Sequence, residues 1–354
     1  MHRENSVATA LLLALLSKTE EKSSKHRSAL VRQGPLYKVY SNFHSRVKVV
    51  LAGGSGNVGS VLRRHFAGRG DEVIVLSRSG RGGATVWDGE TLGPWVSALE
   101  GADVVINLAG RTVNCRYNAH NLREMMDSRV RSTKVLGQAL GQVGSQAVWL
   151  QSSTATIYAH RFDAANDEET GILGGQEPHA PPKWVASIEI AKAWEAELEA
   201  ANVPGVRKVA MRSAMTMSAD PGSVFHVLAT LARRGLGGRL GNGKQFVSWI
   251  HEADFAASID FLIDRKDLDG PINLCSPYPL PQAEFAQQLR KAVGAPFGLP
   301  AAAWMIEIGT WAMRTESELV LKSRRVVPKR LLDAGFEFRY PHWTDAAADL
   351  ASRM

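Results

Sequence analysis

Four closely spaced glycines have a pattern that could hold a phosphate. Gly53, Gly54, Gly56 and Gly59 lie between a short apolar run and a segment of helical periodicity. In GxxGxxG, the first glycine permits a sharp turn, the second lets a pyrophosphate approach the backbone, and the third lets helix and strand pack closely. The helix start would direct N–H groups at the anion. A tight turn alone is the alternative, but the flanking strand and helix favour a dinucleotide site at Gly53, Gly54, Ser55, Gly56, Asn57, Val58 and Gly59.

The next apolar run indicates which dinucleotide is bound. Folds that prefer NAD tend to place Asp or Glu at the end of the second strand, where the carboxylate accepts a hydrogen bond from the ribose. This chain has VLSRSGRGG there. Ser77 and Arg78, with Arg81 behind them, suit a 2′-phosphate, so we expect NADP(H) to be preferred over NAD(H). The alternative is that Arg78 is a solvated surface charge.

The elements that would position these residues alternate along the chain. Strand-like runs occupy 47–53, 71–79, 84–88, 103–110, 147–155, 206–215 and 271–277. Helical patterns occupy 58–70, 96–102, 121–144, about 184–201, 281–294, 300–314 and 316–335. Strands separated by helix-length connections indicate βαβ units, so we predict an α/β fold with a doubly wound parallel sheet. The glycine-rich stretch 231–255 is too irregular to form such a unit.

Composition and charge exclude several classes of protein. The 354 residues carry a net charge of +7, of which +5 falls within residues 1–46, so the rest is nearly balanced and no nucleic-acid partner is expected. The run VATALLLALL is too short to span a bilayer, and no membrane association is expected. Cys115 and Cys275 have neither disulfide-framework nor metal-ligand spacing. We expect a cytoplasmic protein without a metal.

Several strings resemble the extended short-chain dehydrogenase/reductase superfamily, and within it the atypical epimerase family oxidoreductases with a DUF1731 C-terminal domain. The strings are LAGGSGNVG, VINLAG, DSRVRST, SSTATIYA, GGRLGNGKQFVSWIHEAD, GPINLCSP and VVPKRLLDAGFEFRYP. The resemblance implies a disordered extension over 1–45, an NAD(P)-binding Rossmann domain over 46–285 with a small substrate-side lobe, and a DUF1731-like helical domain over 286–345.

The resemblance also implies site residues. Backbone atoms of Leu108, Ala109 and Gly110 would lie along the cofactor, and Ser153 or Thr154 would face the nicotinamide. A second group would converge above the cofactor and suit an anionic or ring-bearing small-molecule substrate: Arg116, Tyr117, Arg129, Trp249 and His251. His251 is more often a structural histidine than a proton carrier.

The usual catalytic pair of the superfamily is missing. Its YxxxK motif places a tyrosine acid and a lysine on one helix face, but Ile188 stands four residues before Lys192. Tyr158 could supply the hydroxyl beside Ser153, or it could be a packed ring. The sequence therefore predicts an NADP(H)-dependent oxidoreductase that uses Ser153, Tyr158 and Lys192; the alternative is a catalytically silent NADP(H)-binding regulator or redox sensor.

Overall fold

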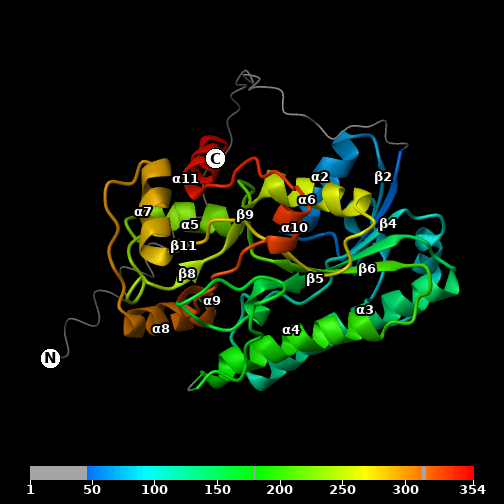
Figure 1. Ribbon diagram of the computed structural model, residues 1–354, viewed down its shortest axis with the longest axis horizontal. Helices are drawn as coiled ribbons and strands as arrows, with labels where there is room; N and C mark the ends of the chain where they lie inside the picture. The colour runs from blue at the N-terminus through cyan, green and yellow to red at the C-terminus, as the bar shows by residue number, and fades with distance from the viewer. Residues whose placement is uncertain (1–45, 179, 313–315) are drawn as a thin grey trace. The chain divides into compact units, whose positions relative to one another are not determined.

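The computed structural model describes residues 46–354 except 179 and 313–315, and the predicted disordered extension lies outside the described residues. Its centre is a seven-stranded parallel sheet in the order β10-β6-β5-β4-β1-β2-β3 (Figure 1). The strands are β1 (Lys48–Ala52), β2 (Glu72–Ser77), β3 (Thr85–Val86), β4 (Val104–Asn107), β5 (Val148–Thr154), β6 (Arg207–Ser213) and β10 (Gly270–Leu274). The predicted doubly wound sheet is confirmed.

Helices cover both faces of the sheet, as expected for parallel strands of near-continuous apolar sequence. Figure 1 shows α2 (Asn57–Gly68) and α6 (Glu252–Asp264) on one side and α3 (Ala119–Gln142) and α4 (Pro182–Ala200) on the other. Successive side chains of a strand point to opposite faces. Val49 of β1 therefore packs in the core beneath α2 and α6, and Val50 packs in the core beneath α3 and α4.

The strand order reverses beside β1. β2 and β3 lie on one side of β1, and β4, β5, β6 and β10 lie on the other. In open α/β sheets, ligands bind outside the carboxyl ends of the strands at such a reversal. The loops that follow β1 and β4 are therefore the first place to look for a site.

A second core lies in a small lobe made from the second half of the chain. Three helices and two short strand pairs build it: α5 (Val224–Arg233), α7 (Gln282–Ala292), α11 (Trp343–Ser352), β7 (Met215–Met217) with β9 (Trp249–His251), and β8 (Phe246–Val247) with β11 (Leu280–Pro281). The Trp343 ring stacks on Phe285 with centroids 4.2 Å apart and lies 5.0 Å from the Trp249 ring. Its Nε1 donates to the Phe285 carbonyl at 3.0 Å.

The C-terminal region differs from its predicted two helices. α8 (Ala303–Ala312) forms as expected, but the pattern over 316–335 is divided into α9 (Glu318–Leu321) and α10 (Lys329–Asp333). Between them, Lys322, Ser323 and Val326 are buried against other parts of the chain. Pro328 then lacks the N–H that a continuous helix would need.

Three further differences concern element type. Residues predicted as the helix 96–102 form a 3₁₀ helix instead, η2 (Pro94–Leu99), and two other 3₁₀ turns occur, η1 (Arg81–Gly83) and η3 (Ala155–Ile157). The helices α5, α6 and α11 were not predicted. Two of them border the glycine-rich stretch, and that composition concealed their helical periodicity.

We expect the Trp343→Ala substitution to lower the free energy of unfolding by about 3–5 kcal/mol, because it empties the centre of the lobe core. Trp304→Ala is the matched control. Its side chain is 64% exposed, so a change within about 0.5 kcal/mol is expected. Urea denaturation followed by circular dichroism measures both, and equal losses in the two variants would contradict the lobe core described here.

Candidate nucleotide and substrate site

The loops after β1 and β4 touch at the strand-order reversal. Gly53 has φ +77°, and a Cβ added to it would lie 2.7 Å from the Ala109 backbone. Its N–H donates to the Leu76 carbonyl at 2.9 Å. Only glycine meets both demands, a left-handed conformation and an approach without a side chain. The first motif glycine therefore makes the turn that brings the two loops together.

The other two glycines of the motif, Gly56 and Gly59, have different roles: one leaves space for a ligand and the other allows close packing. A Cβ on Gly59 would lie 2.3 Å from the Gly54 carbonyl oxygen, so α2 packs directly on the loop. A Cβ on Gly56 would meet no atom within 4 Å. Gly56 is also the N-cap of α2, which has no side-chain cap. The first N–H groups of the helix are thus left for an anion, which is the arrangement that the GxxGxxG spacing predicts.

The rest of this loop is held by the small lobe and the core. The Asn57 Nδ2 donates to the Gly222 carbonyl at 3.1 Å, so the loop before α5 lies beside the start of α2. Val58 packs against the core beneath α2, and Ser55 is exposed. The lobe therefore borders the predicted nucleotide loop.

The end of β2 has the polarity expected for a 2′-phosphate. Ser77 is buried, and its Oγ has no hydrogen-bond partner among the described residues. Arg78 and Arg81 are exposed in the turn that follows. An orphaned hydroxyl and two cations stand where a carboxylate would stand in a fold that prefers NAD.

The backbone of the residues after β4 is held in place mainly by hydrogen bonds of its own N–H groups. The Leu108 N–H donates to the Ala52 carbonyl at 2.7 Å, and the Ala109 N–H donates to the Asn107 Oδ1 at 3.0 Å. Gly110 follows, exposed to solvent. The loop after β4 thus presents backbone atoms along this edge, and their contact with a cofactor stays a prediction.

Ser153 and Thr154, the two positions considered for the hydroxyl that faces the nicotinamide, have different surroundings. The Ser153 side chain is buried, and its Oγ donates to the Glu195 Oε1 at 2.5 Å. Glu195 also binds the Arg212 guanidinium at 2.9 and 2.7 Å. Thr154, the other position considered, is partly exposed at the end of β5 and accepts a hydrogen bond from the Thr156 N–H. Alternation along the strand turns Ser153 toward α4 and leaves Thr154 at the open edge.

Tyr158 lies in the same buried network. Its hydroxyl accepts from the Arg212 Nη1 at 2.9 Å and donates to the Asn273 Oδ1 at 3.0 Å. The side chain is 2% exposed, and burial raises its pKa to about 12. A phenol enclosed in this way has no path to a substrate, so the contacts favour the packed-ring interpretation.

Helix α4, at the place where the superfamily usually carries its catalytic tyrosine and lysine, contains no tyrosine. Ile188 is fully buried. Lys192 is partly exposed, and its Nζ lies 2.9 Å from the Glu189 Oε1. Lys192 is not joined to the network of Ser153 and Tyr158, so these three predicted residues do not form one constellation.

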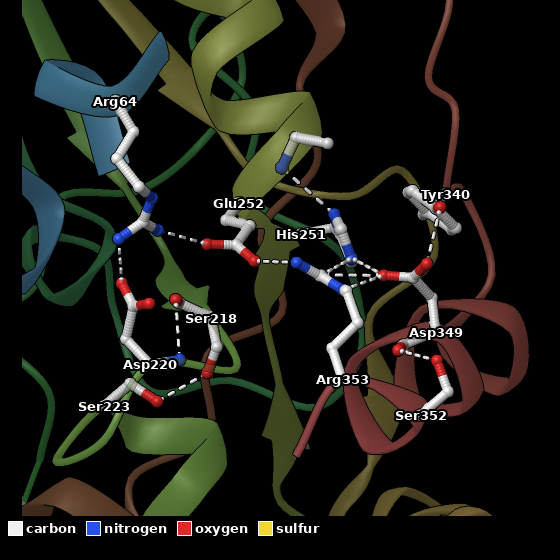
Figure 2. Close-up of polar contacts among 11 residues, drawn as sticks. Arg64, Ser218, Asp220, Ser223, His251, Glu252, Tyr340, Asp349, Ser352 and Arg353 are labelled. Carbon is white, nitrogen blue, oxygen red and sulfur yellow. Dashed lines mark hydrogen bonds and ion pairs between the residues drawn. The ribbon is translucent and has the colours of Figure 1, made fainter. Parts of the chain in front are cut away.

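Trp249 and His251 both belong to β9 in the small lobe. Trp249 is fully buried against Trp343 in the lobe core. The His251 Nδ1 accepts from the Ala253 N–H, and its Nε2 lies 3.0 Å from the Asp349 Oδ2 (Figure 2). Burial lowers the pKa of His251 to about 4, so the ring is neutral at pH 7. Both side chains make their contacts within the lobe, which favours structural roles for them; their placement above a cofactor stays a prediction.

A chain of ion pairs links helix α2 to this lobe, and Figure 2 shows it. Arg64 of α2 lies 2.8 Å from Asp220 and 3.2 Å from Glu252. Glu252 in turn lies 2.6 Å from Arg353 at the end of α11. The C-terminal helix is thereby tied to the helix that begins at the glycine loop.

Residues 316–324, called here the C-terminal strap, contact the loop after β4 and the start of α4. The Glu316 Oε1 accepts from the Tyr117 N–H at 2.7 Å and lies 3.7 Å from the Arg116 Nε. Its Oε2 lies 2.8 Å from the Lys183 Nζ. Tyr117 and Arg116 are therefore brought together, and their loop is fixed by a carboxylate from far along the chain.

The strap also forms hydrogen bonds with the turn after β5. The Lys322 Nζ donates to the Thr156 carbonyl at 2.8 Å, and the Arg324 Nε donates to the Thr156 Oγ1 at 3.0 Å. Lys322 is almost fully buried, and burial lowers its pKa to about 8. Glu318 accepts from the Ser187 Oγ at 2.7 Å. Sequence reasoning missed these three charges, because TESELVLKSRR has the pattern of an exposed helix.

The comparisons with known proteins agree with this geometry. A family model described as NAD dependent epimerase/dehydratase family matches residues 49–275, and one described as Domain of unknown function (DUF1731) matches residues 301–350. Epimerase family protein SDR39U1 of Bos taurus is 30% identical over 304 residues, which is 83% of this chain and 96% of the relative. The chain belongs to the NAD dependent epimerase/dehydratase family. The resemblance predicted from the sequence is confirmed.

Solved structures of the same family share the fold. The crystal structure of human epimerase family protein SDR39U1 with NADPH has a TM-score of 0.74 and 26% identity, and covers 86% of this chain and 99% of that one. A nucleoside-diphosphate sugar epimerase from Corynebacterium glutamicum has a TM-score of 0.68 and 26% identity; the match covers 87% of this chain and 58% of that one.

The described residues contain neither a membrane-spanning helix nor a cluster of metal-ligand side chains. Within 46–354, apart from the gaps, no helix is long and apolar enough to cross a membrane. The same residues contain no cluster of His, Cys, Asp and Glu side chains that could hold a metal ion.

We expect Tyr158→Phe to lower the free energy of unfolding by about 1–3 kcal/mol, because Arg212 and Asn273 would each lose a buried hydrogen-bond partner. The affinity for a bound nucleotide should not change. Urea denaturation and a ligand titration measure the two quantities. Unchanged stability with lost ligand binding would instead place the hydroxyl in the site.

Proposed function

We propose that the protein binds NADP(H) in preference to NAD(H) and acts as an oxidoreductase on a small molecule. The observation that carries the proposal is the open space at Gly56 beside the uncapped start of α2, with Ser77 and Arg78 at the end of β2. Human SDR39U1, the relative crystallised with NADPH, supports the choice of cofactor.

The residues present fit such a cofactor at three points. The N–H groups at the start of α2 would hold the pyrophosphate, and Ser77 and Arg78 would hold the 2′-phosphate. The backbone of Leu108–Gly110 would lie along the nicotinamide half. When bound, NADP(H) supplies hydride chemistry at its nicotinamide.

The proton that accompanies a hydride needs a partner in the protein. Ile188 has no ionisable group, and the Tyr158 hydroxyl is enclosed. Thr154, partly exposed at the end of β5, is the hydroxyl that we place against a substrate oxygen, and Lys192 on α4 occupies the position of the usual lysine. Thr154 would orient the substrate, with water completing the proton transfer.

One observation favours a second function. Because the residues that replace the usual acid are an isoleucine and a buried tyrosine, the chain could bind NADP(H) without turning it over, as a regulator or redox sensor. A panel of aldehydes, ketones and quinones offered with NADPH separates the two. Oxidation of NADPH in the presence of any of these compounds supports the enzyme. Tight binding of NADPH without oxidation by any of them supports the regulator.

We expect Gly56→Val to abolish NADPH binding while leaving the fold intact. A Cβ at this position meets no protein atom within 4 Å, so we expect the new side chain to displace a ligand rather than the fold. Gly68→Val, at the other end of α2, is the matched control, because a Cβ there also meets no atom within 4 Å. Fluorescence titration with NADPH measures the effect. Wild-type affinity in a folded Gly56→Val variant would show that the loop is only a turn.

We expect wild-type protein to bind NADPH more tightly than NADH, and Arg78→Ala to remove most of that difference. A charge-assisted contact with the 2′-phosphate contributes about 1.5–3 kcal/mol, or roughly 10- to 150-fold in affinity. Lys266→Ala, which removes an exposed charge from the turn before β10, should change neither affinity. Equal wild-type affinities for the two cofactors would refute the preference.

A further inference from the structure

Arg129 is a buried cation without a carboxylate partner. It is 9% exposed on α3, and its guanidinium lies over the Trp194 ring with Cζ 4.9 Å from the centroid. Its Nη1 donates to the Met125 carbonyl at 3.0 Å. In the part of the chain that the structure describes, the Met125 carbonyl is the hydrogen-bond acceptor of the guanidinium and no carboxylate lies within ion-pair distance of it. A buried guanidinium held by one carbonyl is costly unless something else compensates it.

Another buried arginine shows what compensation looks like. Arg212, equally buried, is held by two contacts to Glu195 and one to the Tyr158 hydroxyl. The two acidic residues of α3, Glu124 and Asp127, are already engaged. Glu124 pairs with Arg111, and Asp127 pairs with Arg131. The unmatched charge is therefore not due to a lack of acidic residues on α3, because those residues are paired with other arginines.

The guanidinium lies next to the predicted nucleotide edge. A Cβ added to Gly110 would lie 3.2 Å from the Arg129 Cζ and 3.4 Å from its Nη2. Gly110 itself is exposed. Any larger residue would cover the guanidinium from this side, so glycine leaves it uncovered where the loop after β4 reaches the carboxyl edge of the sheet.

The groups around Arg129 do not neutralise it. Tyr117 and Met125 belong to one apolar cluster beside it, with Ile190 of α4. Burial raises the pKa of Tyr117 and lowers that of Arg129 to about 10, so at pH 7 the phenol is neutral and the guanidinium is charged. A planar cation in apolar surroundings matches a planar or tetrahedral oxyanion.

We propose that Arg129 binds an oxyanion, a carboxylate or phosphate, that a ligand places over Gly110. The proposal rests on the proposed function for the identity of the site but not for its chemistry. Two sources share that chemistry: the pyrophosphate of the dinucleotide and an acidic group on the substrate. The separate anion cradle at Gly56 favours the substrate, which would make the substrate an acid.

The test compares four proteins: wild type, Arg129→Gln, Arg129→Lys and Arg131→Gln. Arg131 is the matched control, since it lies on the same helix with its charge exposed and paired with Glu90 and Asp127. Calorimetry measures the affinity for NADPH alone, and then for malonate and inorganic phosphate with NADPH present. Circular dichroism confirms that each variant is folded.

We expect Arg129→Gln to weaken binding of at least one of these three probes by about tenfold or more. Arg129→Lys, which keeps the charge but loses the fork of donors, should recover part of it. Arg131→Gln should behave as wild type. Loss confined to malonate or phosphate assigns the oxyanion to the substrate, and loss confined to NADPH assigns it to the cofactor. Equal affinities for every probe in wild type and Arg129→Gln would overturn the proposal.

A second variant keeps the test decisive if Arg129→Gln does not fold. Gly110→Ser leaves the charge in place but covers it, and it should weaken the same probe. Unchanged binding there would also overturn the proposal. The outcome is separable from the proposed function. Wild-type protein that binds no NADPH contradicts the proposed function, whereas malonate or phosphate binding measured without NADPH still tests Arg129.

Discussion

The contact between Gly53 and Ala109 is the constraint on which the rest of the site depends. The loops after β1 and β4 meet there at a distance that leaves no room for a side chain. Because β1 is where the strand order reverses, this contact lies at the carboxyl edge of the sheet, where ligands bind in open α/β folds. The start of α2 follows the first of these loops, and Gly110, which approaches Arg129, follows Ala109 in the second. An elongated ligand with negative charge on more than one group would match both loops.

The loops at this edge are held by segments far away in the chain. The C-terminal strap fixes the loop after β4 through Glu316 and the turn after β5 through Lys322 and Arg324. Burying these charges costs free energy, which their hydrogen bonds to backbone atoms offset. The region matched by the model of a domain of unknown function therefore has a physical role, because the strap just inside it holds two loops at the edge of the sheet.

Backbone features could be predicted from the sequence, and side-chain directions could not. The role of the glycine spacing and the alternation of strands and helices follow from local periodicity and from the φ values that only glycine adopts easily. The missing YxxxK pair follows from the resemblance and from the identity of Ile188. Ser153, Tyr158 and His251 were assigned from motifs that resemble those of a family, and each side chain points into the protein. A one-residue step along β5 decides between Ser153 and Thr154, and no pattern in the sequence specifies it. The interrupted helix over 316–335 was missed for a related reason, since burial of Lys322 depends on tertiary contacts.

The two buried arginines show how the same residue type comes to serve different purposes. Arg212 lies at the end of β6 and binds Glu195 and Tyr158. Because Glu195 also binds Ser153, the charge of Arg212 helps to hold β5, β6 and α4 together. Arg129 has the same burial but lies beneath a glycine at the open edge of the sheet, with its neighbouring carboxylates paired to other arginines. A fold that needed Arg129 only for packing could place an apolar side chain on Trp194 at lower cost. The positive charge of Arg129 is therefore better explained by an anionic ligand than by any group within the described chain.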